Sequence, residues 1–353
     1  MSKNIFYFLA SIALALSATS ATADSPATVA TVPDGMVTLP IVHGVTNYLS
    51  LPLTQVSIYT TTVSAVTTNT LTVDDTPAPF TASLLPTRTP YFVRFLSGKE
   101  IGRVMLVSSH TTKALTVDTT DHISGEAVAL TTTGFAVQAG DTFEIFPGDT
   151  LASVFGDGTA NNPLAVSGGS ASSMGDIVAL YTTGTLTAPT YFYNTSTKYW
   201  ELAGSTANAN NTIIYPYSAL TVLRRSTHPD TTLTLSGRVA PVAPTTKVAS
   251  RGTVFTSTHF ATDIKLSQLQ FTSNWIQGAT VLSSDSLGVW NATLSRFDTY
   301  YQMTDSTWRK YPDATTDQSN FIIPAGTVAT IAKKTAVTGA ATLLGSALPY
   351  SLN

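Results

Sequence analysis

The side chains that could perform chemistry are few and scattered. The 353 residues include five histidines, 21 acidic residues, 18 basic residues and no cysteine. Cysteine nucleophiles and thiolate metal sites are therefore excluded. The histidines are not spaced as a metal pair, and no serine lies in a Gly-x-Ser-x-Gly motif. The sequence thus predicts no catalytic residue, no metal site and no cofactor, and an enzyme site would have to combine distant residues.

Two short segments contain oxygen ligands that could hold a cation. Asp118 and Asp121 flank two threonines just before His122, and residues 157–162 read Asp-Gly-Thr-Ala-Asn-Asn. Aspartate and threonine close turns through hydrogen bonds to their own backbone, which explains the first segment. The second lacks the bidentate acid and the fixed spacing of a calcium loop. We interpret both segments as polar turns.

One small cluster of charge occurs where charge is otherwise sparse. Lys99, Glu100 and Arg103 fall in a glycine-containing turn between two apolar runs. Exposed charge pairs of this kind are common and contribute little energy. We predict a solvated hairpin tip.

Tyrosine and tryptophan recur with the same spacing in two segments that resemble each other. Tyr193 precedes Trp200, and Tyr301 precedes Trp308, in each case across a polar turn. These four side chains are the candidate ligand-binding residues, because sugar rings stack on aromatic planes. The alternative is that they form the core of each hairpin, since aromatic side chains bury much apolar area and cross-strand pairs stabilise sheets. Their recurrence favours the core.

The similarity extends beyond these hairpins and predicts a module repeated at an offset of about 108 residues. The further matches are Asp176 with Asp285, Ile213-Ile214 with Ile322-Ile323, and Arg224-Arg225 with Lys333-Lys334. A shorter echo relates residues 63–74 to residues 107–118, each of which is expected to form a hairpin.

The elements that position these residues are expected to be strands. Apolar and polar residues alternate with period two along most of the chain, and turn residues recur at intervals of about 8 to 12. We predict an all-β fold of repeated antiparallel β-sandwich or β-barrel modules, with at most one short helix near 149–155. The predicted limits are a signal peptide at 1–23, an N-terminal β domain at 24–156, a Gly/Ser/Asn-rich linker at 157–173, a β module at 174–240, and a related module with the C-terminal tail at 241–353.

The N-terminus has the pattern of a secretory signal peptide. Lys3 precedes an apolar run at 5–16, and Ala21-Thr22-Ala23 offers small residues before a cut at Asp24. The alternative, a membrane-spanning helix, needs about 20 apolar residues, and no later segment approaches that length. The mature chain is expected to be secreted or held at the cell surface.

The charge balance bears on the partners. The formal net charge is −3, and no run of like charge occurs. A nucleic-acid partner normally requires a basic stripe that neutralises phosphates, so none is expected. Self-association or a cell-surface glycan fits a weakly charged chain rich in threonine and serine better.

Several motifs in their order resemble an uncharacterised family of exported, β-rich verrucomicrobial proteins. The resemblance covers nearly the whole mature chain but brings no catalytic or binding residue with it. Its motifs are the two Tyr/Trp hairpins and the segments 47–53, 89–93, 97–98, 102–103, 115–118 and 148–156.

The sequence leaves three classes of function open. The first is an exported structural or cell-surface assembly protein, which export, repeated strand modules and low charge favour. The alternative is a secreted glycan-binding or adhesion module, which the four aromatic residues favour. A secreted hydrolase is the third, supported only by fold class and compartment.

Overall fold

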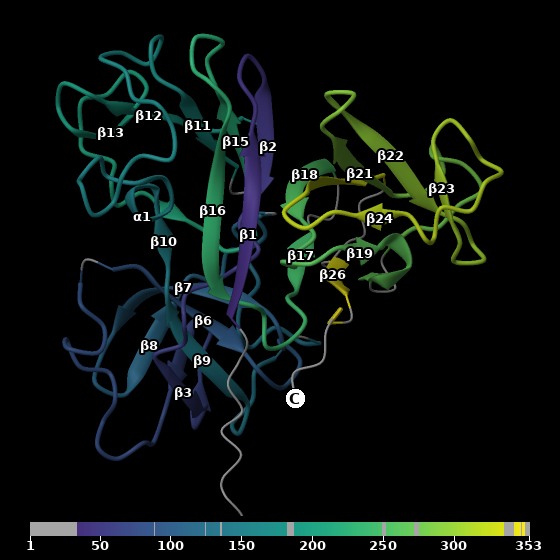
Figure 1. The fold of residues 1–353 in the computed structure, drawn as a ribbon. Coiled ribbons are helices and arrows are strands. Elements are labelled where there is room, and N and C mark those ends of the chain that lie inside the picture. The colour runs from purple at the N-terminus through teal and green to yellow at the C-terminus, as the bar shows by residue number, and fades with distance from the viewer. Residues whose placement is uncertain are drawn as a thin grey trace, which may run out of the picture. The chain divides into compact units, whose positions relative to one another are not determined.

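Strands make up most of the regular structure in the computed structural model of this protein (Figure 1). It describes residues 34–87, 89–123, 125–134, 136–181, 187–248, 252–271, 275–334, 342–346 and 348–349. Within these residues the helical elements are α1 (Leu151–Phe155) and the 3-10 turn η1 (Leu266–Gln268). The predicted all-β class is therefore confirmed. The predicted signal peptide, residues 1–23, lies outside the described residues.

The short helix predicted near 149–155 forms at Leu151–Phe155. The hydroxyl of Thr150 accepts a hydrogen bond from the Ser153 backbone N–H at 3.2 Å, which satisfies one of the free donors in the first turn. Gly156 ends the helix with a positive φ of 88°.

A seven-stranded antiparallel sheet uses residues 59–147, which we call the insert. Its two predicted hairpins form as β4–β5 and β7–β8, and they lie side by side because β5 pairs with β8. The strands run in the order β3 (Tyr59–Thr62), β9 (Thr142–Pro147), β6 (Tyr91–Phe95), β7 (Val104–His110), β8 (Ala114–Val117), β5 (Thr70–Thr72) and β4 (Ala65–Val66).

The strands on either side of the insert belong together, and we call them the first module. Strand β2, before the insert, pairs with β15, far beyond it, and the long strand β1 pairs with β16 (Figure 1). The sheets are β13 (Tyr199–Leu202), β12 (Thr190–Asn194), β11 (Ile177–Leu180), β15 (Ala219–Leu223) and β2 (Thr46–Ser50); β1 (Asp34–Ile41) with β16 (Thr231–Arg238); and β10 (Asp149–Thr150) with β14 (Ile213–Ile214).

The remaining strands, which we call the second module, have the same order. Its two smaller sheets match those of the first module, except that β20 adds a third strand to one of them. The sheets are β23 (Trp308–Lys310), β22 (Arg296–Gln302), β21 (Ser286–Asn291), β25 (Val328–Lys333) and β18 (Gly252–Ser257); β17 (Thr246–Val248), β26 (Thr342–Ser346) and β20 (Leu269–Phe271); and β19 (Ile264–Lys265) with β24 (Ile322–Ile323).

The register of the central strands also matches between the modules. In the first module Tyr48 and Ala179 both lie opposite Thr221. In the second, Phe255 and Gly288 both lie opposite Thr330. Equivalent positions can therefore be read directly from the pairing. The predicted domain limits remain a prediction, although β1 and β2 pair with strands from the predicted 174–240 module.

Each sheet system buries its own apolar residues, and a further cluster joins the insert to the first module. Phe92, Val104 and Phe146 of the insert are buried there against Tyr217. Burial on both faces explains why all five residues of β6 are inaccessible to solvent.

A buried ion network crosses this same junction. Arg94 donates to Glu144 at 2.8 Å, and Arg238 of β16 donates to the other carboxylate oxygen of Glu144 at 2.9 Å. Arg94 also donates to the Tyr217 hydroxyl at 2.8 Å and to Thr54 at 3.1 Å. Because Arg94 and Glu144 are fully buried, the loss of either charge would leave the other without compensation.

The charged turn after β6 corrects the sequence-based expectation. Lys99 is exposed, but Glu100 and Arg103 are buried and paired at 3.2 Å, so the prediction of a solvated tip was wrong for these two. Arg103 also donates to the carbonyl of Thr119 at 2.9 Å. The connection between the modules covers this turn, since Thr245 N–H donates to Gly102 at 3.1 Å.

Glu144→Gln should lower the free energy of unfolding by about 3–5 kcal/mol, because two guanidinium groups would then share a neutral partner. Chemical denaturation measures this loss. Asp34→Asn is the matched control, since it removes an exposed carboxylate from β1. A change no larger than that of the control would contradict a role for the network in joining insert and module.

Candidate functional site: an open cleft and its covered counterpart

The four predicted ligand-binding aromatic residues lie in the cores of their hairpins. The exposed fractions are 4% for Tyr193, 0% for Trp200, 2% for Tyr301 and 1% for Trp308. The Trp200 indole N–H donates to the Gly156 carbonyl at 2.7 Å. A sugar stacks on an accessible ring face, so in this structure neither tryptophan can serve as a platform.

The two hairpins differ by one residue in the turn. Tyr193 lies directly opposite Trp200, with residues 195–198 in the turn. Trp308 instead lies opposite Gln302, and Tyr301 opposite Arg309, because residues 303–307 form a longer turn. Equal spacing along the sequence therefore does not give equal pairing across the hairpin.

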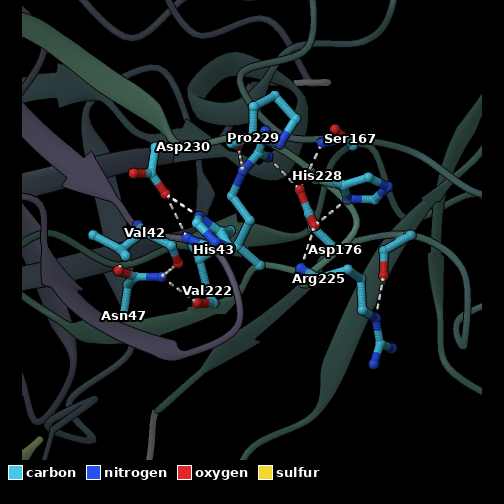
Figure 2. A network of polar contacts seen from close by, with 12 residues as sticks. Val42, His43, Asn47, Ser167, Asp176, Val222, Arg225, His228, Pro229 and Asp230 are labelled. Carbon is cyan, nitrogen blue, oxygen red and sulfur yellow. Dashed lines mark hydrogen bonds and ion pairs between the residues drawn. The ribbon is translucent and has the colours of Figure 1, made fainter.

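A buried carboxylate organises the end of the central sheet in the first module (Figure 2). Asp176, which precedes β11, accepts hydrogen bonds from Arg224 at 2.6 Å and from the Arg225 backbone N–H at 2.9 Å. It also pairs with His228 Nδ1 at 2.7 Å and accepts from the Ser167 backbone N–H at 2.7 Å. The side chain of Asp176 is completely buried.

The second module has the same arrangement around Asp285. This carboxylate pairs with Lys333 at 2.5 Å and accepts from the Lys334 and Ile276 backbone N–H groups, each at 2.8 Å. Because the bonds recur with lysine in place of arginine, we interpret both carboxylates as structural. Asp176 and His228 resemble two members of a hydrolase triad, but no hydroxyl in the described part of the chain bonds to the other imidazole nitrogen.

The two segments considered for cation binding form turns, as predicted. Asp157 accepts from the Thr159 N–H at 3.0 Å, and Asp118 accepts from the Thr120 N–H at 2.9 Å. No group of three or more potential metal ligands occurs within the described residues. The turn at residues 118–121 is nevertheless not an exposed one, since His122, which follows it, is buried.

That turn of the insert covers the segment between β14 and β15. The His122 ring stacks on Tyr215 with ring centroids 4.8 Å apart, and its Nε2 lies 3.0 Å from the Pro216 carbonyl oxygen. The next residue, Ile123, is buried in the core of the second module. A short polypeptide segment thus fills the space between Tyr215 and the second module.

The equivalent segment of the second module is open. Pro324, Ala325 and Gly326 follow β24 as Tyr215, Pro216 and Tyr217 follow β14. They line a cleft of about 560 Å³ whose opposite wall comes from β1 and β2 of the first module. The cleft is a candidate binding site because its volume and mostly apolar lining are those of ligand pockets.

Aromatic rings form part of the lining of this cleft. Tyr48 of β2 packs against Trp290 of β21 with centroids 4.2 Å apart, and both line the cleft. The reciprocal pair, Phe255 of β18 with Tyr181, has centroids 4.3 Å apart. Equivalent residues thus meet twice, so the two modules contact each other through related surfaces.

Hydrogen bonds to backbone carbonyls also join equivalent residues of the two modules. Ser50 N–H donates to the Gly326 carbonyl at 3.2 Å, and the Ser257 hydroxyl donates to the Tyr217 carbonyl at 2.9 Å. Tyr217 has a positive φ of 64°, which is unfavourable for a side chain of its size, whereas its counterpart Gly326 has a φ of 72° at little cost. The tyrosine is needed because its hydroxyl bonds to Arg94.

No sequence motif pointed to the cleft. Its walls combine β2 with β21 and β24, which only the fold brings together. The repeat did reveal the buried aspartates, because Asp176 and Asp285 recur with basic pairs at equivalent distances.

None of the helices in the described residues is long and apolar enough to cross a membrane. No family model, curated protein or solved structure matches this chain.

The junction of insert and modules should respond to acid. Burial lowers the pKa of His259 to about 4, with neighbouring His122 adding to the effect and Asp121 opposing it. The unfolded chain therefore binds more protons between pH 6.5 and 4, so stability is complete above this window and is lost as the pH falls through it.

Between about pH 7 and about pH 5, the free energy of unfolding should decrease by about 2 kcal/mol from this histidine alone. Urea denaturation at both pH values measures it. His259→Asn should weaken the pH dependence. Equal pH dependence in wild type and His259→Asn would contradict the assignment.

Proposed function

We propose that this protein is an exported structural protein of the cell surface that assembles through protein–protein contacts. The observation that carries the proposal is an inequality between equivalent surfaces. The segment after β14 is covered by the insert, whereas the equivalent segment after β24 lines an open, mostly apolar cleft. Exposed apolar patches of this kind are typical of interaction sites.

The proposal includes an origin by duplication. Two copies of one module, with the insert lying between β2 and β10 of the first, would account for the shared strand order, the shared register and the two buried aspartates. Strands β17 and β26 would then correspond to β1 and β16. A duplicated module supplies two like surfaces, and an insert in one copy makes them unequal.

Export and membership of the verrucomicrobial family belong to the same proposal. Both rest on the motifs of the sequence. The proposed role is not catalytic, and a hydrolase would need a nucleophile near the pair of Asp176 and His228.

The mature chain from Asp24 should form ordered species larger than a monomer as its concentration rises, because the cleft leaves apolar surface exposed to water. Light scattering and negative-stain electron microscopy measure this directly. A monomer at every concentration would contradict the assembly proposal.

Glycan binding is the second candidate, and a different hollow favours it. A groove of about 550 Å³ on the second module is lined by Tyr301 and Tyr311, with hydroxyl groups from Thr280, Ser286 and Thr299. The Tyr311 side chain is 57% exposed, so its ring offers a face to a sugar.

Glycan arrays followed by titration calorimetry test this second function. Tyr311→Ala should weaken binding of any glycan found by about tenfold or more, which is the loss of one stacking contact. Tyr199→Ala, which removes a partly buried tyrosine of the first module, is the control. Equal loss in both variants, or no glycan at all, would set this candidate aside.

A further inference from the structure

We propose that the open cleft between the modules binds a short polypeptide segment of a second copy of this chain. The inference rests on the proposed assembly function and names the surface that would perform it. It follows from how the covered counterpart of the cleft is filled, from the chemistry of the cleft walls and from the weak charge of the chain.

The covered counterpart shows what kind of occupant such a surface takes. His122 of the insert supplies a ring that stacks on Tyr215 and a nitrogen that meets the Pro216 carbonyl, and Ile123 supplies an aliphatic side chain that enters the core of the second module. These contacts come from two consecutive residues in a turn. The occupant is therefore a short piece of polypeptide.

The open cleft lacks this occupant at equivalent positions. Ile213, the first residue of β14, is partly buried beside the insert, whereas Ile322, the first residue of β24, is 54% exposed. Ile322 borders the cleft together with Pro324 and Ala325. Covering these residues would remove apolar surface from water, which stabilises a complex by about 25 cal/mol per Å².

The polar groups at the rim already have partners, which favours an apolar occupant over a sugar. The Asn291 amide donates to Asp298 at 2.8 Å, and its oxygen accepts from the Leu294 N–H at 3.1 Å. Asp298 also pairs with Lys310 at 2.8 Å. A ligand rich in hydroxyl groups would find few of these groups available and would lose hydration without replacement.

A second copy is the favoured source of the segment. This chain already contains a segment that fits the related surface, and its net charge of −3 over 353 residues gives little repulsion between copies. The cleft of one copy would receive a different surface of the next. Such a heterologous contact extends into open chains unless the rotation closes a ring.

Ile322→Arg tests the inference in the full mature chain. The charged side chain would lie beside the cleft, where an apolar contact is expected. Because Ile322 is exposed, the substitution should not disturb folding. Met174→Arg is the control, because Met174 is 59% exposed and belongs to the first module. Thermal unfolding verifies that both variants fold as the wild type does.

Wild type and Met174→Arg should assemble over the same concentration range, whereas Ile322→Arg should need at least about tenfold more protein. If Ile322→Arg assembles like the wild type, the cleft is not the contact, although the assembly function stands. If the wild type is a monomer throughout, both proposals are overturned.

Cross-linking identifies the occupant independently of any loss of assembly. The chain has no cysteine, so Ile322→Cys accepts a single photoreactive label. A mixture of labelled protein with isotopically heavy protein should give cross-linked peptides that join light and heavy chains. Cross-links confined to one chain, or none under assembling conditions, would overturn the inference.

Discussion

The pairing of β2 with β15 is the constraint on which the rest of the structure depends. It closes the central sheet of the first module with a strand that precedes the insert, so the sheet cannot be complete until the insert and β11–β13 have been traversed. Such non-local pairing carries a loop-closure cost that grows only slowly with length, so a long insertion is tolerated. The second module closes in the same way, with β18 on β25, and only residues 258–263 join β18 to β19.

The insert changes the surface it touches. Arg94 and Glu144 hold it to Arg238 and Tyr217, and His122 covers Tyr215 and Pro216. The second module has Pro324, Ala325 and Gly326 in place of residues 215–217. A side chain at Gly326 would bring its Cβ within 2.6 Å of Leu39. Gly326 thus packs against Leu39 of the first module, and residues 324–326 also line the open cleft. Two like modules thereby present unlike surfaces within one chain.

The sequence predicted the elements better than it predicted their surroundings. Alternating apolar and polar residues predicted the strands, because this signal acts within a few residues, and a short helix was predicted near 149–155. The burial of Glu100 and Arg103 could not be foreseen, since it depends on the connection near Thr245, far along the chain. The recurrence of the aromatic pairs favoured a core position, and all four side chains are buried. The cleft escaped prediction because its walls meet only after the modules have packed.

Hydrogen–deuterium exchange at low and high protein concentration tests the central claim most directly, because it compares the two equivalent segments within one molecule. The exchange of residues 213–217 should be the same at every concentration, since the insert covers them, and that of residues 322–327 should slow as the protein assembles. Unchanged exchange at 322–327 in an assembled sample would contradict the account.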